Sequence, residues 1–346
     1  MRQLIRTEKG GGPSHPLRVV RDNSVRAFDN ISAWSSSRWS DVRRGAFLSM
    51  DRSLPRRPWI DRYVLMARFF RAHKRLPLDV SDPKAGFNDL IFHRLTTDSW
   101  KLLERFCIDK EFVKLFVSAV CSEVRWAKNL KVLAVDAESD IDRACASLRE
   151  LSGSAAVAKP THGSGTVLFL KRSPSEEEIM RFVREASKSY YYVSRESQYK
   201  NLDPKIIVEE DLSQNGKAPC DFKFFCARGE VLFCQVDTDR FTDHRRLLVS
   251  PNFDPIDVKY MYEHPDEPVE KPENFEQMLK IARHLSKYFY FSRVDLYSIQ
   301  GETYFSELTF APEGGAGSLS NEEFGVSMLH RIRSLQTGKM GEAAVG

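Results

Sequence analysis

Hydrophobic residues recur at helical spacing in the first part of the chain. The pattern over residues 59–74 predicts a helix, and a second helical region is predicted over about 88–124, in two pieces around Ile108-Asp109. Residues 1 to about 58 contain Gly, Ser and Pro clusters with little periodicity, so this stretch is expected to be poorly ordered.

Short apolar runs typical of strands follow from residue 131 onward. Strands are predicted at 132–135, which we expect to be buried, and at 155–159, 166–170 and 206–208. Ser175, with Glu178 three residues later, forms a capping-box pattern that predicts the start of a helix running to about residue 191.

The last third of the chain is predicted to be rich in strands. Arg228-Gly229 separates the predicted strands 221–227 and 230–236 and is typical of a two-residue hairpin turn. A long loop is expected over 237–270. A helix with its apolar face over 275–289 follows, capped by Asn274 and Gln277, and a second hairpin joins 293–299 to 303–310.

These elements indicate an α+β protein with two β-rich lobes. Four regions are expected: a basic extension (1–75), a helical region (76–130), a central lobe (131–212) and a C-terminal lobe (213–346).

The composition is that of a soluble globular protein, with 42% hydrophobic and 29% charged residues. No apolar run approaches the length needed to cross a bilayer, and we expect no secretory signal. The six cysteines show no metal-binding or paired spacing, so a reduced, cytoplasmic setting is expected.

Positive charge is concentrated at the N-terminal end. The chain up to Leu76 has 17 Lys+Arg and 6 Asp+Glu, whereas the whole chain has a net charge of +4, so the remainder is net acidic. This stretch is either a solvated extension without a partner or a contact for an anionic glycan or membrane surface. Nucleic acid is not an expected partner, because the basic residues follow no recognisable pattern.

A lysine and a glycine-rich turn lie between the predicted strands at 155–159 and 166–170. Lys159 ends the first strand and is followed by Pro160-Thr161 and then by His162, Gly163, Ser164 and Gly165. Glycines allow backbone N–H groups to approach a phosphate, and the lysine supplies a cation beside them. An ordinary hairpin with a flexible tip remains the alternative.

A predicted strand ends in the acidic run Glu209-Glu210-Asp211-Leu212. An adenine ring needs an acceptor for its amine and backbone groups along its edge, which a strand end at a hinge supplies. The alternative is a plain acidic loop.

Asp295 and Glu307 fall on the two strands of the second hairpin. With a three-residue turn at 300–302, Asp295 lies opposite Glu307 on one face, together with Arg293, Tyr297 and Thr309. A two-residue turn would place the carboxylates on opposite faces. Two facing carboxylates suit Mg²⁺, whereas the alternative is a salt-bridge ladder with Arg293.

A further cationic group comes from Asp221-Phe222-Lys223, where Lys223 shares a face with Asp221, and from Arg240 and His244 beyond the next strand. Such cations hold phosphates or anionic substrates. For His244 the alternative is a solvated loop histidine.

Taken in order, these motifs resemble the ATP-grasp superfamily, and in particular its TupA-like branch, named for teichuronopeptide biosynthesis. The likeness covers residues 76–334 and is carried by separated segments that match in order: Asp109-Lys110, 159–165, Glu209-Glu210, 221–226, 271–275, 293–297 and 307–310.

The resemblance implies a nucleotide site and a metal site in this chain. Lys159 and Lys110 would flank the phosphates, the loop from His162 to Gly165 would close over them, and Glu209 would bind the adenine amine. The backbone from Glu210 to Leu212 would form the hinge. Asp295 and Glu307 would hold Mg²⁺, with Thr309 standing where many relatives have Asn.

The family chemistry implies an ATP- and Mg²⁺-dependent carboxylate–amine ligase that works through an acylphosphate, with Lys223, Arg240 and Arg293 as catalytic cations. Polysaccharide or capsule decoration, such as joining an amino acid to a sugar acid, is the expected setting by analogy. Two alternatives stay open: an ATP-grasp kinase acting on a sugar or polyol hydroxyl, and a non-catalytic nucleotide-binding partner of a glycan assembly complex.

Overall fold

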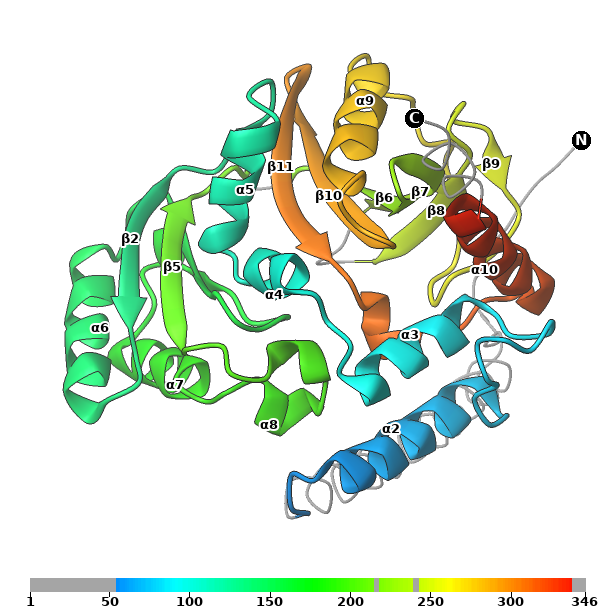
Figure 1. Ribbon diagram of the computed structural model, residues 1–346. Helices are drawn as coiled ribbons and strands as arrows, with labels where there is room; N and C mark the ends of the chain where they lie inside the picture. Colours follow the sequence, from blue (N-terminus) through cyan, green and yellow to red (C-terminus); the bar gives the residue numbers. More distant parts are fainter. Residues whose placement is uncertain (1–53, 215–217, 239–242, 338–346) are drawn as a thin grey trace, which may run out of the picture. The chain divides into compact units, whose positions relative to one another are not determined.

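The structure, a computed structural model, describes residues 54–214, 218–238 and 243–337. Residues from Arg56 onward form one compact unit that contains two sheets with their helices (Figure 1). The α+β architecture with two β-rich lobes is confirmed. The expectation of disorder falls almost entirely on residues outside the described ranges.

Four helices precede the first sheet: α2 Pro58–His73, α3 Phe87–Thr97, α4 Leu102–Ile108 and α5 Phe112–Val120. Lys74, the C-cap residue of α2, adopts the left-handed backbone conformation. Leu65 and Phe69 of α2 belong to the main hydrophobic core. The stretch 1–75 is therefore not wholly an extension, because α2 packs into the body of the protein.

The central lobe is a four-stranded sheet in the order β2-β5-β3-β4, with β2 Asn129–Ala134, β5 Lys205–Glu210, β3 Ala156–Pro160 and β4 Leu168–Phe169. Helices α6 Glu138–Glu150 and α7 Glu176–Ala186 pack against each other and cover one side (Figure 1). The predicted buried strand at 132–135 is wrong in one respect: β2 is an edge strand, and its side chains are half-buried or exposed.

The capping box of α7 is confirmed. The Ser175 N–H donates to Glu178 Oε2 (2.8 Å), and the Glu178 N–H donates to Ser175 Oγ (3.3 Å). The helix ends at Ala186 and not near residue 191. The short α8 Tyr191–Ser194 and a 3₁₀ turn, Ser197–Tyr199, follow before β5.

The C-terminal lobe is a seven-stranded sheet in the order β1-β11-β10-β6-β7-β8-β9. Its strands are β1 Arg125–Trp126, β6 Asp221–Ala227, β7 Glu230–Thr238, β8 Arg245–Val249, β9 Pro255–Ile256, β10 Ser292–Ile299 and β11 Glu302–Thr309. The long loop expected over 237–270 is wrong, because it contains β8 and β9.

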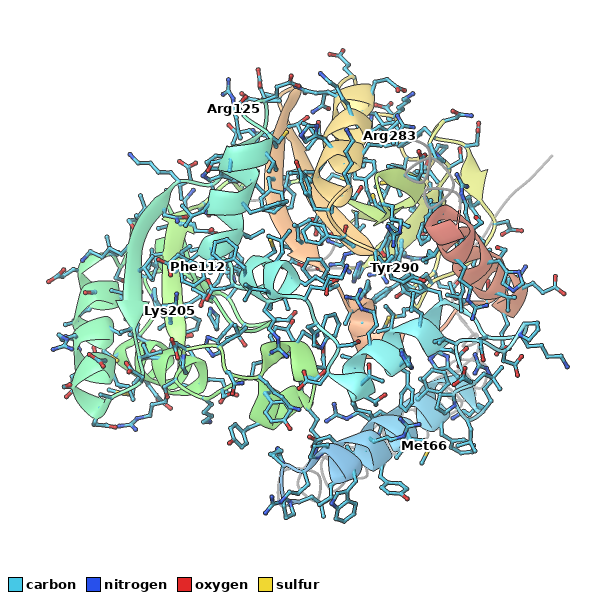
Figure 2. The ribbon with its side chains drawn as sticks, viewed as in Figure 1. Met66, Phe112, Arg125, Lys205, Arg283 and Tyr290 are labelled. Carbon is cyan, nitrogen blue, oxygen red and sulfur yellow. The ribbon has the colours of Figure 1, made fainter. Side chains whose placement is uncertain are left out.

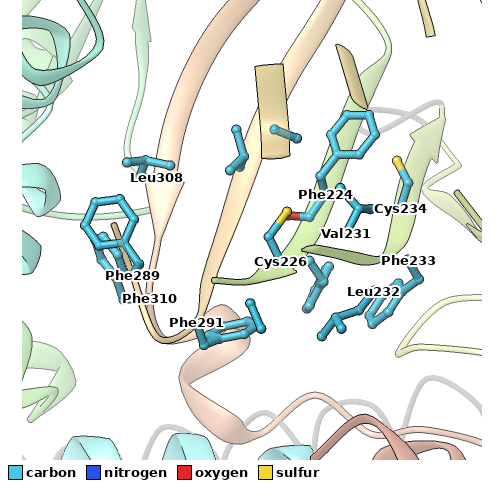
Figure 3. Close-up of a cluster of buried hydrophobic side chains, with 14 of the residues drawn as sticks. Phe224, Cys226, Val231, Leu232, Phe233, Cys234, Phe289, Phe291, Leu308 and Phe310 are labelled. Atoms are coloured by element: carbon cyan, nitrogen blue, oxygen red, sulfur yellow. The ribbon is translucent and has the colours of Figure 1, made fainter. Parts of the chain in front are cut away.

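Helix α9 Phe275–Ser286 packs on this sheet beside β10 and β6, while α10 Glu322–Thr337 lies against α3 (Figure 1). Phenylalanines and cysteines fill the sheet's core, among them Phe224, Cys226 and Phe291 (Figure 3). Asn274 is the N-cap residue of α9, but its side chain does not cap the helix. Instead Asn274 Nδ2 donates to Thr303 Oγ1 (2.9 Å), so it ties α9 to the second hairpin.

The second hairpin has a two-residue turn, Gln300-Gly301, because Ile299 pairs with Glu302. The three-residue turn predicted from the sequence is wrong. A bulge between Leu296 and Asp295 shifts the register by one residue, so Asp295 still pairs with Glu307.

Candidate active site

The lysine of the glycine-rich turn is engaged by an acid of the neighbouring strand. Lys159 Nζ lies 2.9 Å from Glu209 Oε2, because Lys159 and Ile207 pair across β3 and β5. Lys114 of α5 lies 2.5 Å from Glu209 Oε1 and 2.7 Å from the Ala127 carbonyl oxygen. Glu209 therefore joins two lysines from different elements.

Lys114 was missed by the sequence analysis, since it stands in an apolar helical run with no motif around it. Burial raises the pKa of Glu209, but Lys159 and Lys114 outweigh this effect and the pKa lies below its usual value. Binding of an adenine amine by Glu209 stays a prediction.

The base of the glycine-rich turn is fixed by Asp109 and Lys110. Thr161 Oγ1 donates to Asp109 Oδ2 (3.0 Å), and the Lys110 N–H donates to the Thr161 carbonyl oxygen (3.1 Å). Lys110 Nζ also donates to the Gly163 carbonyl oxygen. Asp109 accepts from the Glu111 N–H (2.8 Å) at the start of α5. The motif Asp109-Lys110 thus anchors the turn to the helical region.

The same helical region holds β5 through Lys205. Its Nζ lies 4.1 Å from the centre of the Phe112 ring and pairs with Glu111, and the Lys205 and Phe112 side chains are labelled in Figure 2. The glycine-rich turn and the neighbouring strand β5 are therefore both fastened to the start of α5.

His162 is placed differently from the expectation that it faces the triphosphate. Its side chain is buried; Nδ1 accepts from the Lys205 N–H (3.4 Å), which makes Nε2 the donor to the Lys188 carbonyl oxygen (3.1 Å). The buried ring therefore holds the turn against β5 and residue Lys188 through these two hydrogen bonds. A Cβ on Gly163 would stand 3.3 Å from the Tyr190 ring, whereas Ser164 and Gly165 are exposed, with Gly165 at a φ of 84°.

The expected hinge begins where β5 ends. The Glu210 N–H donates to the Lys128 carbonyl oxygen (3.1 Å), and Glu210 Oε1 accepts from the Lys128 N–H (3.0 Å). The Asp211 N–H donates to the Ala155 carbonyl oxygen (2.9 Å), and Leu212 is half-buried beyond it. Contact of this backbone with adenine stays a prediction.

Asp295 and Glu307 face the same side of β10 and β11 and share one arginine. Arg293 Nε and Nη2 each lie 2.7 Å from an Asp295 carboxylate oxygen, and Nη2 lies 3.2 Å from Glu307 Oε1. Thr309 Oγ1 donates to Glu307 Oε1 (3.1 Å). Four of the five side chains predicted to share a face are thus joined by hydrogen bonds, while the fifth, Tyr297, accepts from Ser306 Oγ.

Lys223 of β6 extends this group of charged side chains, here called the charged row, which begins with Arg293, Asp295 and Glu307. Its Nζ lies 2.6 Å from Asp221, 3.4 Å from Asp295 and 3.8 Å from Asp237 of β7. Asp237 in turn accepts from Arg246 of β8 at 2.7 Å. Asp237 and Arg246 were missed by the sequence analysis because β8 was not predicted; the short apolar run Leu247-Leu248-Val249 was the available signal.

Arg240, the third predicted catalytic cation, lies outside the described residues. His244 Nε2 lies 3.4 Å from Asp237 Oδ1, and its ring lies against Tyr262 at a centroid distance of 3.8 Å with the ring planes tilted by 34°. His244 therefore belongs to the charged row, not to a solvated loop.

Burial and ion pairs move the two carboxyl groups in opposite directions. Burial raises the pKa of Asp295 to about 6, although Arg293 and Lys223 oppose it. Burial also raises the pKa of Glu307, but Lys110, Arg293 and Lys223 outweigh it and bring the value to about 2. Glu307 is thus firmly ionised, and its strongest cationic neighbour belongs to the segment that fixes the glycine-rich turn.

Lys110 connects the two halves of the site electrostatically. Burial lowers its pKa, while Glu307 and Glu209 raise it and Lys159 lowers it further. The pKa of this one lysine therefore depends both on Glu307 of the large sheet and on the Lys159–Glu209 pair of the small one.

The side chains present fit a magnesium ion that also takes phosphate and water ligands. Among the residues that the structure describes, no group of three or more His, Cys, Asp or Glu side chains could hold a metal by itself. Mg²⁺ in nucleotide enzymes is commonly held by one or two carboxylates, which Asp295 and Glu307 supply. The hydrogen bonds from Arg293 and Thr309 to Glu307 both go to Oε1. Thr309 as a third metal ligand stays a prediction.

The two sheets, the lysine-bearing turn and the paired carboxylates define a protein of the ATP-grasp class. A family model described as TupA-like ATPgrasp matches residues 94–330, and the chain belongs to this family. The search of curated proteins found no match.

Solved structures similar to this chain include D-alanine–D-alanine ligases from Bacillus anthracis (16% identity, TM-score 0.38, 62% of this chain and 60% of that one) and Helicobacter pylori (15%, 0.36, 66% and 61%). A D-Ala:D-Ser ligase from Enterococcus faecalis is similar at 16% identity (TM-score 0.37, 66% and 62%). The alignments thus cover about 60% of these chains. Within the described ranges, none of the helices combines the length and apolar character that a membrane span requires.

Proposed function

We propose that this protein is an ATP- and Mg²⁺-dependent ligase that joins a carboxylate to an amine through an acylphosphate, in polysaccharide or capsule biosynthesis. The observation that carries the proposal is the pairing of Asp295 with Glu307 beside Arg293 and Lys223. Of the cations that lower the pKa of Glu307, Lys110 has the largest effect. Family membership supports the ATP-grasp chemistry.

In this mechanism Lys159 and Lys110 bind the phosphates of ATP, and Asp295 and Glu307 would hold Mg²⁺. Bound Mg²⁺ would neutralise the charge of the phosphates. Arg293 orients both carboxylates through its fixed fork of N–H donors, and Lys223 adds a buried cation beside Asp295.

The γ-phosphoryl group is transferred to the substrate carboxylate, and an amine then displaces phosphate to form the amide. No protein nucleophile is required, so the side chains act by positioning and by electrostatic stabilisation of the transferred group.

The test is mass spectrometry of products formed from ATP, Mg²⁺ and a panel of uronic and amino acids. The expected result is ADP, phosphate and an amide whose formation needs both organic substrates. A phosphorylated product formed without any amine would contradict the ligase and indicate a kinase. Glu177→Gln, which removes an exposed acid on α7, is the matched control for Glu307→Gln, which we expect to be inactive.

A further inference from the structure

Helix α2 has two apolar faces, and the fold uses only one of them. Leu65 and Phe69 belong to the main core, on the side where α2 packs against α3 (Figure 1). Trp59, Tyr63 and Phe70 lie on the other side and are 64%, 61% and 51% exposed. A helix at the surface of a globular protein needs one apolar stripe, facing the core. The outer aromatic residues therefore call for a separate explanation.

The three exposed aromatic residues, here called the aromatic ridge, form one stripe along α2. At 3.6 residues per turn, positions 59, 63 and 70 fall within an arc of about 40° and span roughly 16 Å along the helix axis. The Trp59 and Tyr63 rings meet edge to face, with centroids 6.4 Å apart. Half-buried Met66, labelled in Figure 2, stands three residues after Tyr63 and four before Phe70, which is the spacing of neighbours on a helix surface. The aromatic ridge is therefore one apolar surface and not three isolated side chains.

The helix that carries the ridge is fastened through its opposite side. Buried Asp61 accepts from Arg195 Nη1 (2.6 Å) and from the Tyr191 hydroxyl. At the other end of α2, His73 Nε2 bonds to the Gly315 carbonyl oxygen (2.8 Å). None of these contacts involves the aromatic ridge. A molecule that meets the ridge therefore meets a surface whose position the fold already fixes.

Positive charge accompanies the ridge. Arg62 and Arg71 are exposed on α2, and exposed Lys74 follows the helix. Asp61 is the only acidic residue of α2, and it is buried. The chain up to Leu76 has 17 Lys+Arg against 6 Asp+Glu. The outer side of α2 therefore combines apolar rings with cations and exposes no carboxylate of its own helix.

We propose that the aromatic ridge, with the arginines beside it, is a docking surface for an anionic lipid bilayer. Trp and Tyr are enriched in the headgroup region of membranes, where the apolar ring is buried and its polar atom stays hydrated. Arginine side chains beside them are attracted to anionic lipids. In this arrangement α2 lies in the plane of the membrane surface and its rings enter the headgroup region, while its inner face stays packed on the protein.

The geometry of the rings favours a bilayer over a polysaccharide chain. Sugar rings stack on flat aromatic platforms, whereas the Trp59 and Tyr63 ring planes are inclined to each other by 82°. A fluid headgroup region accommodates rings in any orientation. Charge complementarity then selects anionic lipids, because the exposed charges of α2 are all positive. The proposal does not depend on the ligase reaction, since none of these residues belongs to the candidate active site.

The test is flotation of the full-length protein with lipid vesicles. One set of vesicles contains phosphatidylcholine with one-third phosphatidylglycerol, and the other contains phosphatidylcholine alone. The ridge variant combines Trp59→Ser, Tyr63→Ser and Phe70→Ser. The control variant removes three exposed apolar side chains from other elements: Leu102→Ser, Leu115→Ser and Tyr288→Ser.

We expect the wild type to bind the anionic vesicles more tightly than the neutral ones. The ridge variant should bind the anionic vesicles about tenfold or more weakly than the wild type, because the apolar area of three rings no longer leaves water. The control variant should stay within about twofold of the wild type, because its apolar losses lie away from α2. Both variants should keep the melting temperature that the wild type has without lipid.

A second pair of variants removes no contact of the ridge. Ala67 is exposed on the outer side of α2. Ala67→Glu adds a carboxylate that anionic lipids repel, and Ala67→Gln adds a neutral side chain of the same size. Ala67→Glu should bind the anionic vesicles about threefold or more weakly than Ala67→Gln, with equal melting temperatures. This pair decides the question if the ridge variant does not fold.

The docking surface is overturned if the wild type does not float with anionic vesicles, or if a folded ridge variant floats equally well. Equal flotation of the two Ala67 variants would also overturn it. Sedimentation velocity without vesicles tests for a second copy of the chain, and a wild-type dimer that dissociates in the ridge variant contradicts the proposal. Binding to soluble polyglucuronate in place of vesicles, lost in the ridge variant, would assign the surface to a glycan and contradict it as well.

Discussion

Asp295 pairs with Glu307 only because β11 contains one more residue than β10 between this pair and the turn. Leu296 pairs with Phe305, and the next pair is Asp295 with Glu307, which leaves Ser306 as the extra residue of the bulge. Ser306 Oγ donates to the Tyr297 hydroxyl (3.0 Å) and holds the bulge in place. Bulges often lie beside active sites, where they redirect a side chain.

The two carboxylates should respond differently to neutralisation. Asp295→Asn removes the bidentate partner of buried Arg293, and breaking a buried ion pair costs about 3–5 kcal/mol. Glu307→Gln leaves that pair intact at a more exposed position. We expect Asp295→Asn to lower the melting temperature clearly, and Glu307→Gln to abolish ATP turnover with little thermal change. Equal melting temperatures for the two variants would contradict this difference.

Replacement of Lys159 by Ala should weaken ATP binding by an order of magnitude or more, because a charge-assisted phosphate contact contributes about 1.5–3 kcal/mol. The fold should persist, since Glu209 keeps its 2.5 Å contact with Lys114. Calorimetry measures the affinity.

Lys114→Met is the matched comparison for Lys159→Ala. It removes a buried ammonium that also donates to the Ala127 carbonyl oxygen, so it should lower stability more than Lys159→Ala does. Unchanged ATP binding in folded Lys159→Ala would exclude its proposed role.

Two truncations test where the folded body begins. A protein starting at Arg56 should keep the melting temperature and ATP turnover of the full chain, because the compact unit starts there. A protein starting at Leu76 loses α2, including core residue Phe69 and the Asp61 partner of buried Arg195 (2.6 Å). We expect it to fail to fold. Loss of turnover on truncation to Arg56 would show that the earlier residues belong to the catalytic body.

His162 should make stability depend on pH. Burial lowers its pKa, so below the ordinary value of 6.5 the unfolded chain binds a proton that the folded chain does not. The contribution of His162 to the free energy of unfolding is therefore complete above pH 6.5. It is lost as the pH drops toward the pKa of the folded state. The melting temperature of wild type should fall more steeply between pH 7 and pH 5 than that of His162→Asn. Parallel curves would contradict a buried neutral ring.

The sequence was most informative where local physics decides the structure. The Ser175–Glu178 capping box, the Arg228-Gly229 turn and the helical periodicity behind α2 and α9 depend on neighbours within a few residues, and the structure confirms them. Asp295 does pair with Glu307 as expected, although the turn argument behind that expectation was wrong, and their role as Mg²⁺ ligands stays a prediction.

Features decided by tertiary packing were not predictable in the same way. The short strand β9 has no distinct pattern, and β8 is defined by its pairing with β7. Asparagine is a residue type that often caps helices, but the Asn274 side chain donates to Thr303 Oγ1 of the second hairpin instead. Lys114 looks like an ordinary surface lysine in the sequence, and only the packing of α5 beside β5 makes it a buried partner of Glu209.

The position of Glu209 between two lysines bears on how a nucleotide can arrive and depart. A phosphate that draws Lys159 away leaves Glu209 still compensated by Lys114, so neither step exposes a bare buried carboxylate. Entry is then an exchange of partners for one mobile cation, and departure is the reverse exchange. With Lys159 in its proposed role, such a swap would moderate the affinity for the nucleotide and favour rapid release of the spent nucleotide.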